Sequence, residues 1–307
     1  MPDDYCNQAD RLISAAQLNG FVPVVKSFFD EATNTASHVV HDPVTLEAAI
    51  IDSVLDYDAA SGRTTLNSAN AIIAYVKSIG LSVTWLLETH AHADHLSAAP
   101  YLKTKLGGTL AISSQIIEVQ QVFGKLFNTL STVAPNGSDF EHLFEDGDRF
   151  KIGSIEAIAL HVPGHTPADL AYVIGDAVFV GDTLFMPDSG TARADFPGGN
   201  SGQLFRSIRR LMTLPEMTRM FLCHDYKAAG RDSFAWETTV GAQRIGNVHA
   251  HEGIAQDDFV AMRDARDATL TMPKLILPAI QVNICAGRLP EPEANGVRYL
   301  KIPLDLL

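Results

Sequence analysis

The sequence predicts a layered α/β protein. Strand-like runs lie towards both ends of the chain and helix-like runs lie between them, each with the apolar spacing of its class. Hydrophobic residues make up 46% of the 307 residues and charged residues 19%, which is typical of a globular protein with a sizeable core. No linker-like stretch divides the chain, so we expect one domain over residues 1–307.

The first third of the chain is expected to consist mainly of strands. β-branched or alternating runs, separated by turn-forming Asn, Asp and Pro, begin at Val22, Ala36 and Ala48. A run with helical apolar spacing covers 68–80 and ends at Gly80. The apolar run from Leu81 predicts a buried strand, which leads directly into the stretch "THAHADH".

The rest of the chain continues this alternation. We expect helices over 96–108, 115–123, 202–214, 235–248 and 255–270, with Pro100 inside the first of them. Strands are expected on either side of a turn in 144–153 and over 154–162, 169–175, 177–181 and 219–223. Gly175-Asp176 is a hairpin signal. A loop is expected over 132–139 and a Pro-punctuated, extended tail over about 272–307.

The charge of the chain excludes some classes of partner. There are 23 basic and 36 acidic residues, which gives a net charge of −13. This balance argues against binding to nucleic acid phosphates and against docking on an anionic membrane surface. A small anionic ligand held by a few local cations is compatible with it.

Cysteine content and hydropathy bear on the compartment. The three cysteines, Cys6, Cys223 and Cys285, show no paired spacing, so no disulfide framework or CxxC metal site is expected. A reducing cytoplasm is the simplest interpretation. The N-terminal stretch is acidic and polar, unlike a secretory signal, and no apolar run approaches the roughly 20 residues needed to span a bilayer.

The stretch "THAHADH" concentrates polar, metal-capable side chains. If the backbone stays extended after the strand, His90, His92 and Asp94 point one way and the two intervening alanines the other. His95 follows as the chain turns towards the next helix. Imidazole and carboxylate ligands together suit Zn, Fe or Mn. The alternative is a set of solvated surface histidines with Asp94 as a helix N-cap.

Three later stretches also place a ligand-type residue just past an apolar strand; the residues are His165, Asp182 and His224. His165 follows a Pro-Gly turn that fixes its orientation. Asp182 ends a strongly apolar strand, where an unpaired carboxylate is costly. Each residue alone fits an ordinary structural role, such as capping a turn. Together they predict one metal pocket at one edge of a sheet sandwich.

In order along the chain, these motifs resemble those of the metallo-β-lactamase superfamily. They are HxHxDH at His90–His95, PGHT at Pro163–Thr166, GD at Gly181-Asp182 and HDY at His224–Tyr226. The resemblance covers about Val22 to the 240s and implies an αββα sandwich. It is less specific for the reaction, because relatives include lactamases, thioester hydrolases, phosphodiesterases, lactonases and oxygenases.

Within the superfamily, the stretches around these motifs and "GTARADFPGG" resemble the persulfide dioxygenases. That resemblance implies one Fe(II) per chain, bound by His90, His165 and Asp182 as catalytic ligands. It also implies oxidation of glutathione persulfide by O₂ and water to glutathione and sulfite, and a homodimer. The commoner form of the arginine loop has Cys-Gly before Arg-Thr-Asp-Phe, so only Arg193 is carried over from it.

Glutathione carries two carboxylates, and an acidic protein needs local cations to bind it. The candidate substrate contacts, all in loops next to the metal motifs, are Arg193, Tyr226, Lys227 and Arg231. The alternative for Lys227 and Arg231 is plain surface charge.

The rival hypothesis is a two-zinc hydrolase that resembles hydroxyacylglutathione hydrolase. In that arrangement one zinc is held by His90, His92 and His165, the other by Asp94, His95 and His224, and Asp182 bridges them. In the dioxygenase, His92, Asp94, His95 and His224 instead orient waters and ligands. A metal-stabilised binding protein without turnover is a third class.

Overall fold

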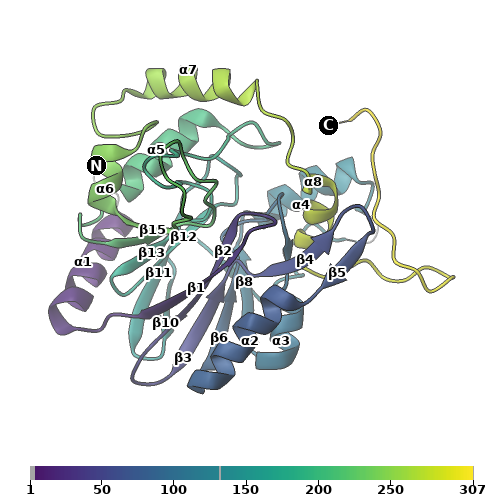
Figure 1. The fold of residues 1–307 in the computed structure, drawn as a ribbon, viewed down its shortest axis with the longest axis horizontal. Helices are drawn as coiled ribbons and strands as arrows, with labels where there is room; N and C mark the ends of the chain where they lie inside the picture. The colour runs from purple at the N-terminus through teal and green to yellow at the C-terminus, as the bar shows by residue number, and fades with distance from the viewer. Residues whose placement is uncertain (1–3, 131–132, 307) are drawn as a thin grey trace.

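The computed structural model describes residues 4–130 and 133–306, and within these ranges the long strands form two six-stranded sheets that face one another (Figure 1). The first sheet has the order β1(Val24–Asp30), β2(Thr35–His41), β3(Glu47–Ile51), β6(Ser82–Leu87), β8(Thr109–Ser113) and β9(His142–Phe144). The second has the order β10(Arg149–Ile152), β11(Ile155–His161), β12(Leu170–Ile174), β13(Ala177–Phe179), β14(Arg219–Phe221) and β15(Glu237–Thr239). A small third sheet joins β5(Arg63–Thr65), β4(Val54–Asp58) and β7(Leu96–Ser97).

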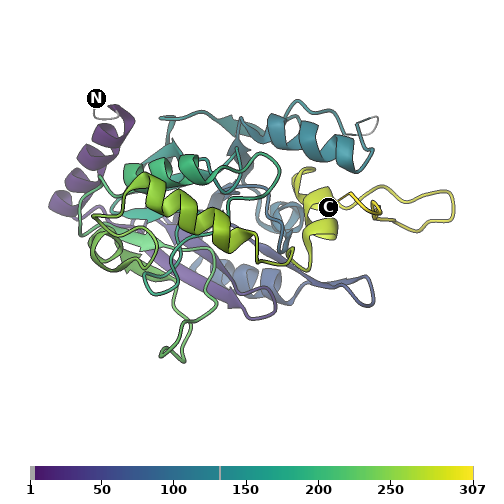
Figure 2. The ribbon, with the colours of Figure 1, turned by 90° about the horizontal axis from the view of Figure 1, so that it is seen from above.

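Helices cover the outer faces of both large sheets. The apolar cluster outside the first sheet includes side chains of α2(Asn67–Ile79), α3(Ala99–Leu106), α4(Ile116–Leu126) and α8(Ile276–Asn283). The cluster outside the second includes side chains of α1(Asp4–Asn19), α5(Ser201–Leu211), α6(Val240–Gly246) and α7(Gln256–Asp267). This confirms the predicted αββα sandwich (Figures 1 and 2).

The two sheets bury a third apolar cluster between them. Ile51, Leu87 and Phe144 from the first sheet pack against Tyr172 and Phe179 from the second. Every residue of β2 is buried, because this strand is covered on both faces. Side chains on both faces of the strand are therefore shielded from solvent. The packed strand ends are rigid, so the loops that follow them start from fixed positions.

The predicted hairpin at Gly175-Asp176 is confirmed. Ile174 of β12 pairs with Ala177 of β13, so the turn holds only these two residues, and Gly175 has a φ of 59°. The predicted end of α2 at Gly80 is also confirmed, since Gly80 has a φ of 77° and its N–H donates to the carbonyls of Lys77 and Val76.

Three predicted elements differ in extent. The helix expected over 96–108 begins at Ala99, because Leu96-Ser97 pairs with β4 instead, and Pro100 lies in the first turn, where its missing N–H costs nothing. The helix expected over 235–248 divides into β15 and α6, because Thr239 pairs with β14 and then caps the helix by accepting from the N–H of Ala242 (3.1 Å). The apolar run from Ala48 divides into β3 and β4.

The helices α1 and α8 and the strand β8 differ from the prediction more strongly. Neither α1 nor β8 was predicted. The buried face of α1 consists mostly of Cys and Ala, which give a weak periodic signal in the sequence. The tail from Met272 was expected to be extended, and this is wrong for 276–283. Pro278 lies in the first turn of α8, which tolerates it, while Ile276, Ala279 and Ile280 form a buried helical face.

After α8 the chain runs to residue 306 without a helix or strand among the residues that the structure describes, and Figure 2 shows this part reaching away from the sandwich. Of the loop predicted over 132–139, Thr132 lies outside the described residues, and 133–139 has neither helix nor strand. Within the described ranges, the helices are all too short or too polar to cross a bilayer.

Candidate metal centre

Four loops that follow strand ends meet at one edge of the sandwich. The HxHxDH residues follow β6, and the other three loops, after β11, β13 and β14, supply His165, Asp182 and His224. Potential ligand atoms of His90, His165 and Asp182 lie within 4.8 Å of one another, and so do those of His92, Asp94, His95 and His224. The structure therefore brings together all seven residues that the sequence singled out for one pocket.

Asp182 lies between the two groups. Its Oδ2 is 3.5 Å from Nε2 of His165 and 3.9 Å from Nε2 of His90. Its Oδ1 is 3.3 Å from Nε2 of His224, which also lies 3.0 Å from Oδ2 of Asp94. One carboxylate thus presents a different oxygen to each group of ligands.

The residues present fit a metal cluster. Six buried side-chain atoms of this pocket make no hydrogen bond within the described residues, and they belong to His90 (Nε2), His92 (Nδ1), Asp94 (Oδ2), His95 (Nε2), Asp182 (Oδ1) and His224 (Nε2). Leaving so many buried polar atoms unpaired costs on the order of 1–3 kcal/mol each. Divalent cations would satisfy them all, and a set of imidazoles with carboxylates suits Zn, Fe or Mn.

In three of these histidines Nε2 faces the pocket, and a hydrogen bond at Nδ1 orients the ring. Thr89 donates its hydroxyl to Asp52 (2.9 Å), so it accepts from Nδ1 of His90 (3.0 Å) and leaves Nε2 as a lone pair. Nδ1 of His165 donates to the carbonyl of Arg193 (2.8 Å). In the same way, Nδ1 of His224 donates to the carbonyl of Asn34 (3.1 Å). Each partner fixes a ring so that its free nitrogen faces the pocket.

His92 lies next to two carboxylates outside the group of candidate ligands. Its Nε2 lies 3.0 Å from Oδ1 of Asp52 and 3.3 Å from Oε2 of Glu88, so Nδ1 is the nitrogen left for a metal. Burial opposes protonation of His92, but the two carboxylates outweigh it and raise its pKa well above 6.5. By contrast, burial and the neighbouring imidazoles hold the pKa of His90 well below 6.5.

Sequence reasoning missed Asp52 and Glu88. Both follow apolar strands, β3 and β6, which pair in parallel, so both carboxylates emerge at the same sheet edge. The signal that singled out Asp182, a carboxylate at the end of an apolar run, was present at Asp52 as well.

Two glycines allow the loops to approach their neighbours. Gly164 has a φ of 149°, and a Cβ there would lie 2.3 Å from the backbone N of Leu204 in α5. Gly181 has a φ of 52°, and a Cβ there would lie 2.5 Å from Oγ1 of Thr89. Any side chain at either position would push His165 or Asp182 out of place.

The sequence profile described as the metallo-beta-lactamase superfamily matches residues 37–224, a range that contains all seven pocket residues. The chain belongs to this superfamily. It is 56% identical over 293 residues to a probable metallo-hydrolase of Burkholderia pseudomallei (strain 1710b), covering 92% of this chain and 99% of that one. It is 45% identical over 285 residues to glyoxylase B2 of Dictyostelium discoideum, covering 92% and 97%.

A solved structure is also similar. The crystal structure of ETHE1 from Myxococcus xanthus superposes with a TM-score of 0.69 at 28% identity and covers 86% of this chain and 100% of that one. The persulfide dioxygenase ETHE1 of Bos taurus is 24% identical over 282 residues, covering 91% of this chain and 94% of that one.

The candidate metal-binding residues adjoin a cleft. The cleft has a volume of about 920 Å³, and Asp94, His165 and Asp182 form part of its lining. Its walls carry the cationic side chains of Arg193, Lys227, Arg263, Arg266 and Lys274. Carboxylates line the cleft as well, those of Asp58, Asp94, Asp182 and Asp188, so its wall offers local cations beside acidic groups in a chain whose net charge is −13.

Three of the four predicted substrate contacts line the cleft, and they are Arg193, Tyr226 and Lys227. Tyr226 lies parallel to the ring of His224, with centroids 5.9 Å apart. The Arg193 guanidinium lies over Phe196 and is held by both oxygens of Asp195 (2.6 and 2.7 Å) and by the carbonyl of Thr271 (2.8 Å). These bonds use three of its five N–H groups, so two are left for a ligand.

Lys227 and Arg231 have different surroundings. Lys227 lines the cleft, with its ammonium group 4.2 Å from the centre of the Phe234 ring. Arg231 donates all five N–H groups, two to Asp188, two to Asp225 and one to the carbonyl of Ser233. The prediction that Arg231 binds substrate therefore does not fit, because its guanidinium has no donor left; it holds two loops together instead.

Proposed function

We propose that this chain is a two-metal hydrolase that cleaves thioesters of glutathione. The observation that carries the proposal is the position of Asp182, whose two carboxylate oxygens face two separate groups of ligands. In this arrangement His90, His92 and His165 would hold one ion, Asp94, His95 and His224 would hold the other, and Asp182 would offer one oxygen to each. When bound, such a pair of ions would lower the pKa of a water molecule and so supply a nucleophile for thioester hydrolysis.

The chain's own residues would prepare the site and bind the substrate. Asp52 and Glu88 hold His92 with Nδ1 facing the pocket, which supports it as a ligand rather than a solvated side chain. Arg193 and Lys227 on the cleft wall suit the two carboxylates of glutathione. Tyr226, next to His224, has a hydroxyl that can donate to the substrate.

The names of similar proteins support this proposal. The most similar relative reported above is named a probable metallo-hydrolase, and another is named glyoxylase B2. The second name agrees with the resemblance of the motifs to those of hydroxyacylglutathione hydrolase.

A second candidate is an Fe(II)-dependent persulfide dioxygenase that converts glutathione persulfide, O₂ and water to glutathione and sulfite. The specific observation in its favour is the similarity to ETHE1 of Myxococcus xanthus, which extends over the whole of that chain. In this case His90, His165 and Asp182 alone hold the metal, and the atoms that His92, Asp94, His95 and His224 present to the pocket bind water or substrate.

Metal analysis with two activity assays distinguishes the candidates. Protein purified without added metal is analysed for iron, zinc and manganese, then tested for glutathione thioester cleavage and for O₂ uptake with glutathione persulfide. The hydrolase is expected to hold about two ions per chain and to cleave thioesters without using O₂. One iron per chain with O₂ uptake would replace it by the dioxygenase.

We further propose that the chain forms a homodimer. The support is the set of exposed apolar side chains in the C-terminal tail, which includes Val297, Ile302 and Leu304. Sedimentation velocity of the full chain is expected to show a dimer, and a shortened chain that ends at residue 288 is expected to dissociate more readily. A monomer at all concentrations would contradict this.

A further inference from the structure

We propose that Asn283, in the C-terminal helix α8, is a positioning residue for the metal centre. Its side-chain amide donates to the carbonyls of His92 and His95, both at 2.8 Å. Its side-chain oxygen accepts from the N–H of Ser97 at 2.9 Å. The residue is only 4% exposed, so these bonds form in the interior and replace water completely.

These three bonds close the HxHxDH loop. The two carbonyls belong to His92 and His95, two candidate ligands whose ring nitrogens lie within 4.8 Å of one another, and one amide group holds both. The loop has no helix or strand between β6 and β7 to hold its shape. The carbonyls of the buried residues His92 and His95 would otherwise lose these partners, so the bonds to Asn283 help to set where this part of the loop lies.

Asn283 also influences His92 by a second route. The N–H of Ser97 is held by Asn283, and the hydroxyl of Ser97 donates to Oε1 of Glu88 at 2.5 Å. The other oxygen of Glu88 lies 3.3 Å from Nε2 of His92. The backbone of His92 and the carboxylate beside its ring are therefore both fixed from α8.

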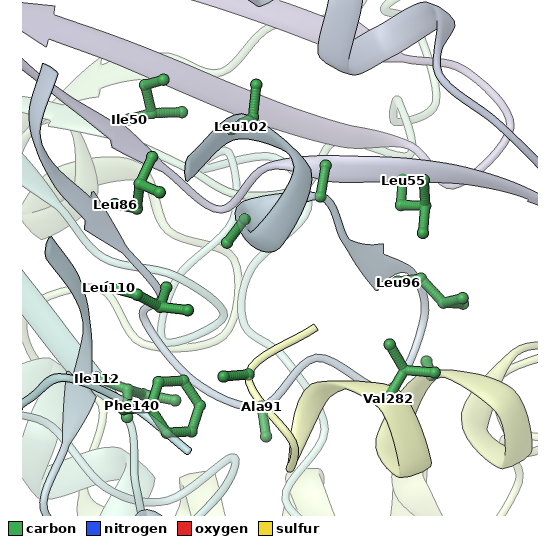
Figure 3. Close-up of a cluster of buried hydrophobic side chains, with 14 of the residues drawn as sticks. Ile50, Leu55, Leu86, Ala91, Leu96, Leu102, Leu110, Ile112, Phe140 and Val282 are labelled. Carbon is green, nitrogen blue, oxygen red and sulfur yellow. The ribbon is translucent and has the colours of Figure 1, made fainter. Parts of the chain in front are cut away.

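The helix that carries Asn283 is itself held firmly. Val282 of this helix and Ala91 of the HxHxDH loop belong to the same apolar cluster, and Figure 3 labels both within it. Just after the helix, Gly287 approaches β7 so closely that a Cβ would lie 2.9 Å from the carbonyl of Ser97. Because the helix is held in place, its Asn283 can hold the loop at a fixed position.

This role lies outside what the family match describes, because that match ends at residue 224. The inference rests on the metal centre of the proposed function but not on its substrate or reaction. The C-terminal part of the chain, which resembled an extended tail in sequence, would thus complete the site.

The test compares two amides of the same helix. Gln281 also donates two side-chain hydrogen bonds, to the carbonyls of Leu277 and Lys301, and accepts one from the N–H of Lys301. It is 8% exposed and its partners lie away from the pocket. Asn283→Leu and Gln281→Leu therefore remove the same number of buried bonds, but only the first removes bonds to the loop.

Zinc dissociation constants are measured for the apoprotein by competition with a chromophoric chelator, alongside thermal unfolding of the same apoproteins. Asn283→Leu is expected to raise the zinc dissociation constant about 10- to 100-fold, as for other residues that orient metal ligands. Gln281→Leu should lower Tm by a similar amount to Asn283→Leu but leave the zinc affinity unchanged. Equal zinc affinity in the two variants would overturn the inference.

A second variant covers the case in which Asn283→Leu does not fold. Asn283→Asp keeps the size and the acceptor for Ser97 but loses both donors to the loop carbonyls, so zinc affinity is again expected to fall. The d–d spectrum of the cobalt-substituted variant should also change, because the loop that carries four of the proposed ligands is displaced. If the parent protein binds no metal, the proposed function fails; if it binds metal and Asn283→Asp binds it equally well with the same spectrum, only this inference fails.

Discussion

Asp182 lies between the two groups of candidate ligands and presents one carboxylate oxygen to each. Asp182→Ala is expected to abolish metal binding in either proposed arrangement, because each group loses a charged ligand. Elemental analysis of the purified variant measures this, and a full metal load would remove Asp182 from the ligands.

Asp94 distinguishes the two arrangements. It lies 3.0 Å from His224 but belongs to the second group only. Asp94→Ala is expected to reduce the metal content from about two ions per chain to about one and to abolish thioester cleavage. Metal analysis that found the same single ion in parent and variant, with activity retained, would contradict the two-metal assignment.

Arg193 and Arg231 form a matched pair of loop arginines. Arg193 keeps two N–H groups for a ligand, whereas Arg231 has none. Arg193→Ala is expected mainly to raise KM, and steady-state kinetics measure the change. Arg231→Ala should leave KM unchanged but destabilise the protein by on the order of 3 kcal/mol, because the buried Asp225 loses its charged partner and keeps only backbone N–H donors. An unchanged KM in Arg193→Ala would exclude it as a substrate contact.

At the scale of elements, the turn before His165 depends on close contact with α5. Gly164 has no room for a side chain against the backbone of Leu204. Gly164→Ala is expected to separate the turn from α5, which costs about 1–3 kcal/mol of stability and weakens metal binding. Gly230→Ala is a suitable control, since Gly230 also has a positive φ but a Cβ there would meet no atom within 4 Å. Denaturant unfolding of both variants checks this, and equal losses would contradict the steric explanation.

Asp42 joins the two sheets. Its Oδ2 accepts from the N–H (2.7 Å) and the hydroxyl (2.6 Å) of Ser154, which precedes β11, while Oδ1 accepts from the N–H of Val44 (2.7 Å). Burial disfavours the carboxylate, but these bonds outweigh it and hold the pKa of Asp42 below its ordinary value of 3.8. A lowered pKa in the folded state means stability that is present above pH 3.8 and lost as the pH falls through the folded pKa.

Asp42→Ala is therefore expected to destabilise the protein at neutral pH by on the order of 2 kcal/mol, and by progressively less below about pH 4. Urea unfolding of parent and variant between pH 7 and pH 3 measures the difference. A difference independent of pH would show that the ionised form of Asp42 does not contribute.

The sequence was most informative where strands end. Long apolar runs marked β6, β11 and β13, and the polar residues just beyond them, such as His90 and Asp182, were predicted to share one pocket for that reason. Asn283 could not be found in this way. It lies in a segment whose prolines suggested an extended tail, and its partners are about 190 residues earlier, so only the tertiary structure brings them together.

At the scale of the whole molecule, the sandwich presents a buried, polar pocket that costs stability unless it is filled. Chelation of the metal is expected to lower Tm by several degrees, because bound ions stabilise only the folded state. Thermal unfolding with and without chelator measures this, and Asp182→Ala, which should bind no metal, provides the control. An unchanged Tm in the parent protein would show that the pocket is stable without ions.

The two-metal hydrolase is tested most directly by counting metal ions in the active protein. Elemental analysis is carried out on parent protein and Asp94→Ala, with thioester cleavage and persulfide-dependent O₂ uptake measured on the same samples. We expect about two ions per chain in the parent, about one in the variant, and thioester cleavage only in the parent. A single iron in both, with O₂ uptake on adding glutathione persulfide, would contradict the account.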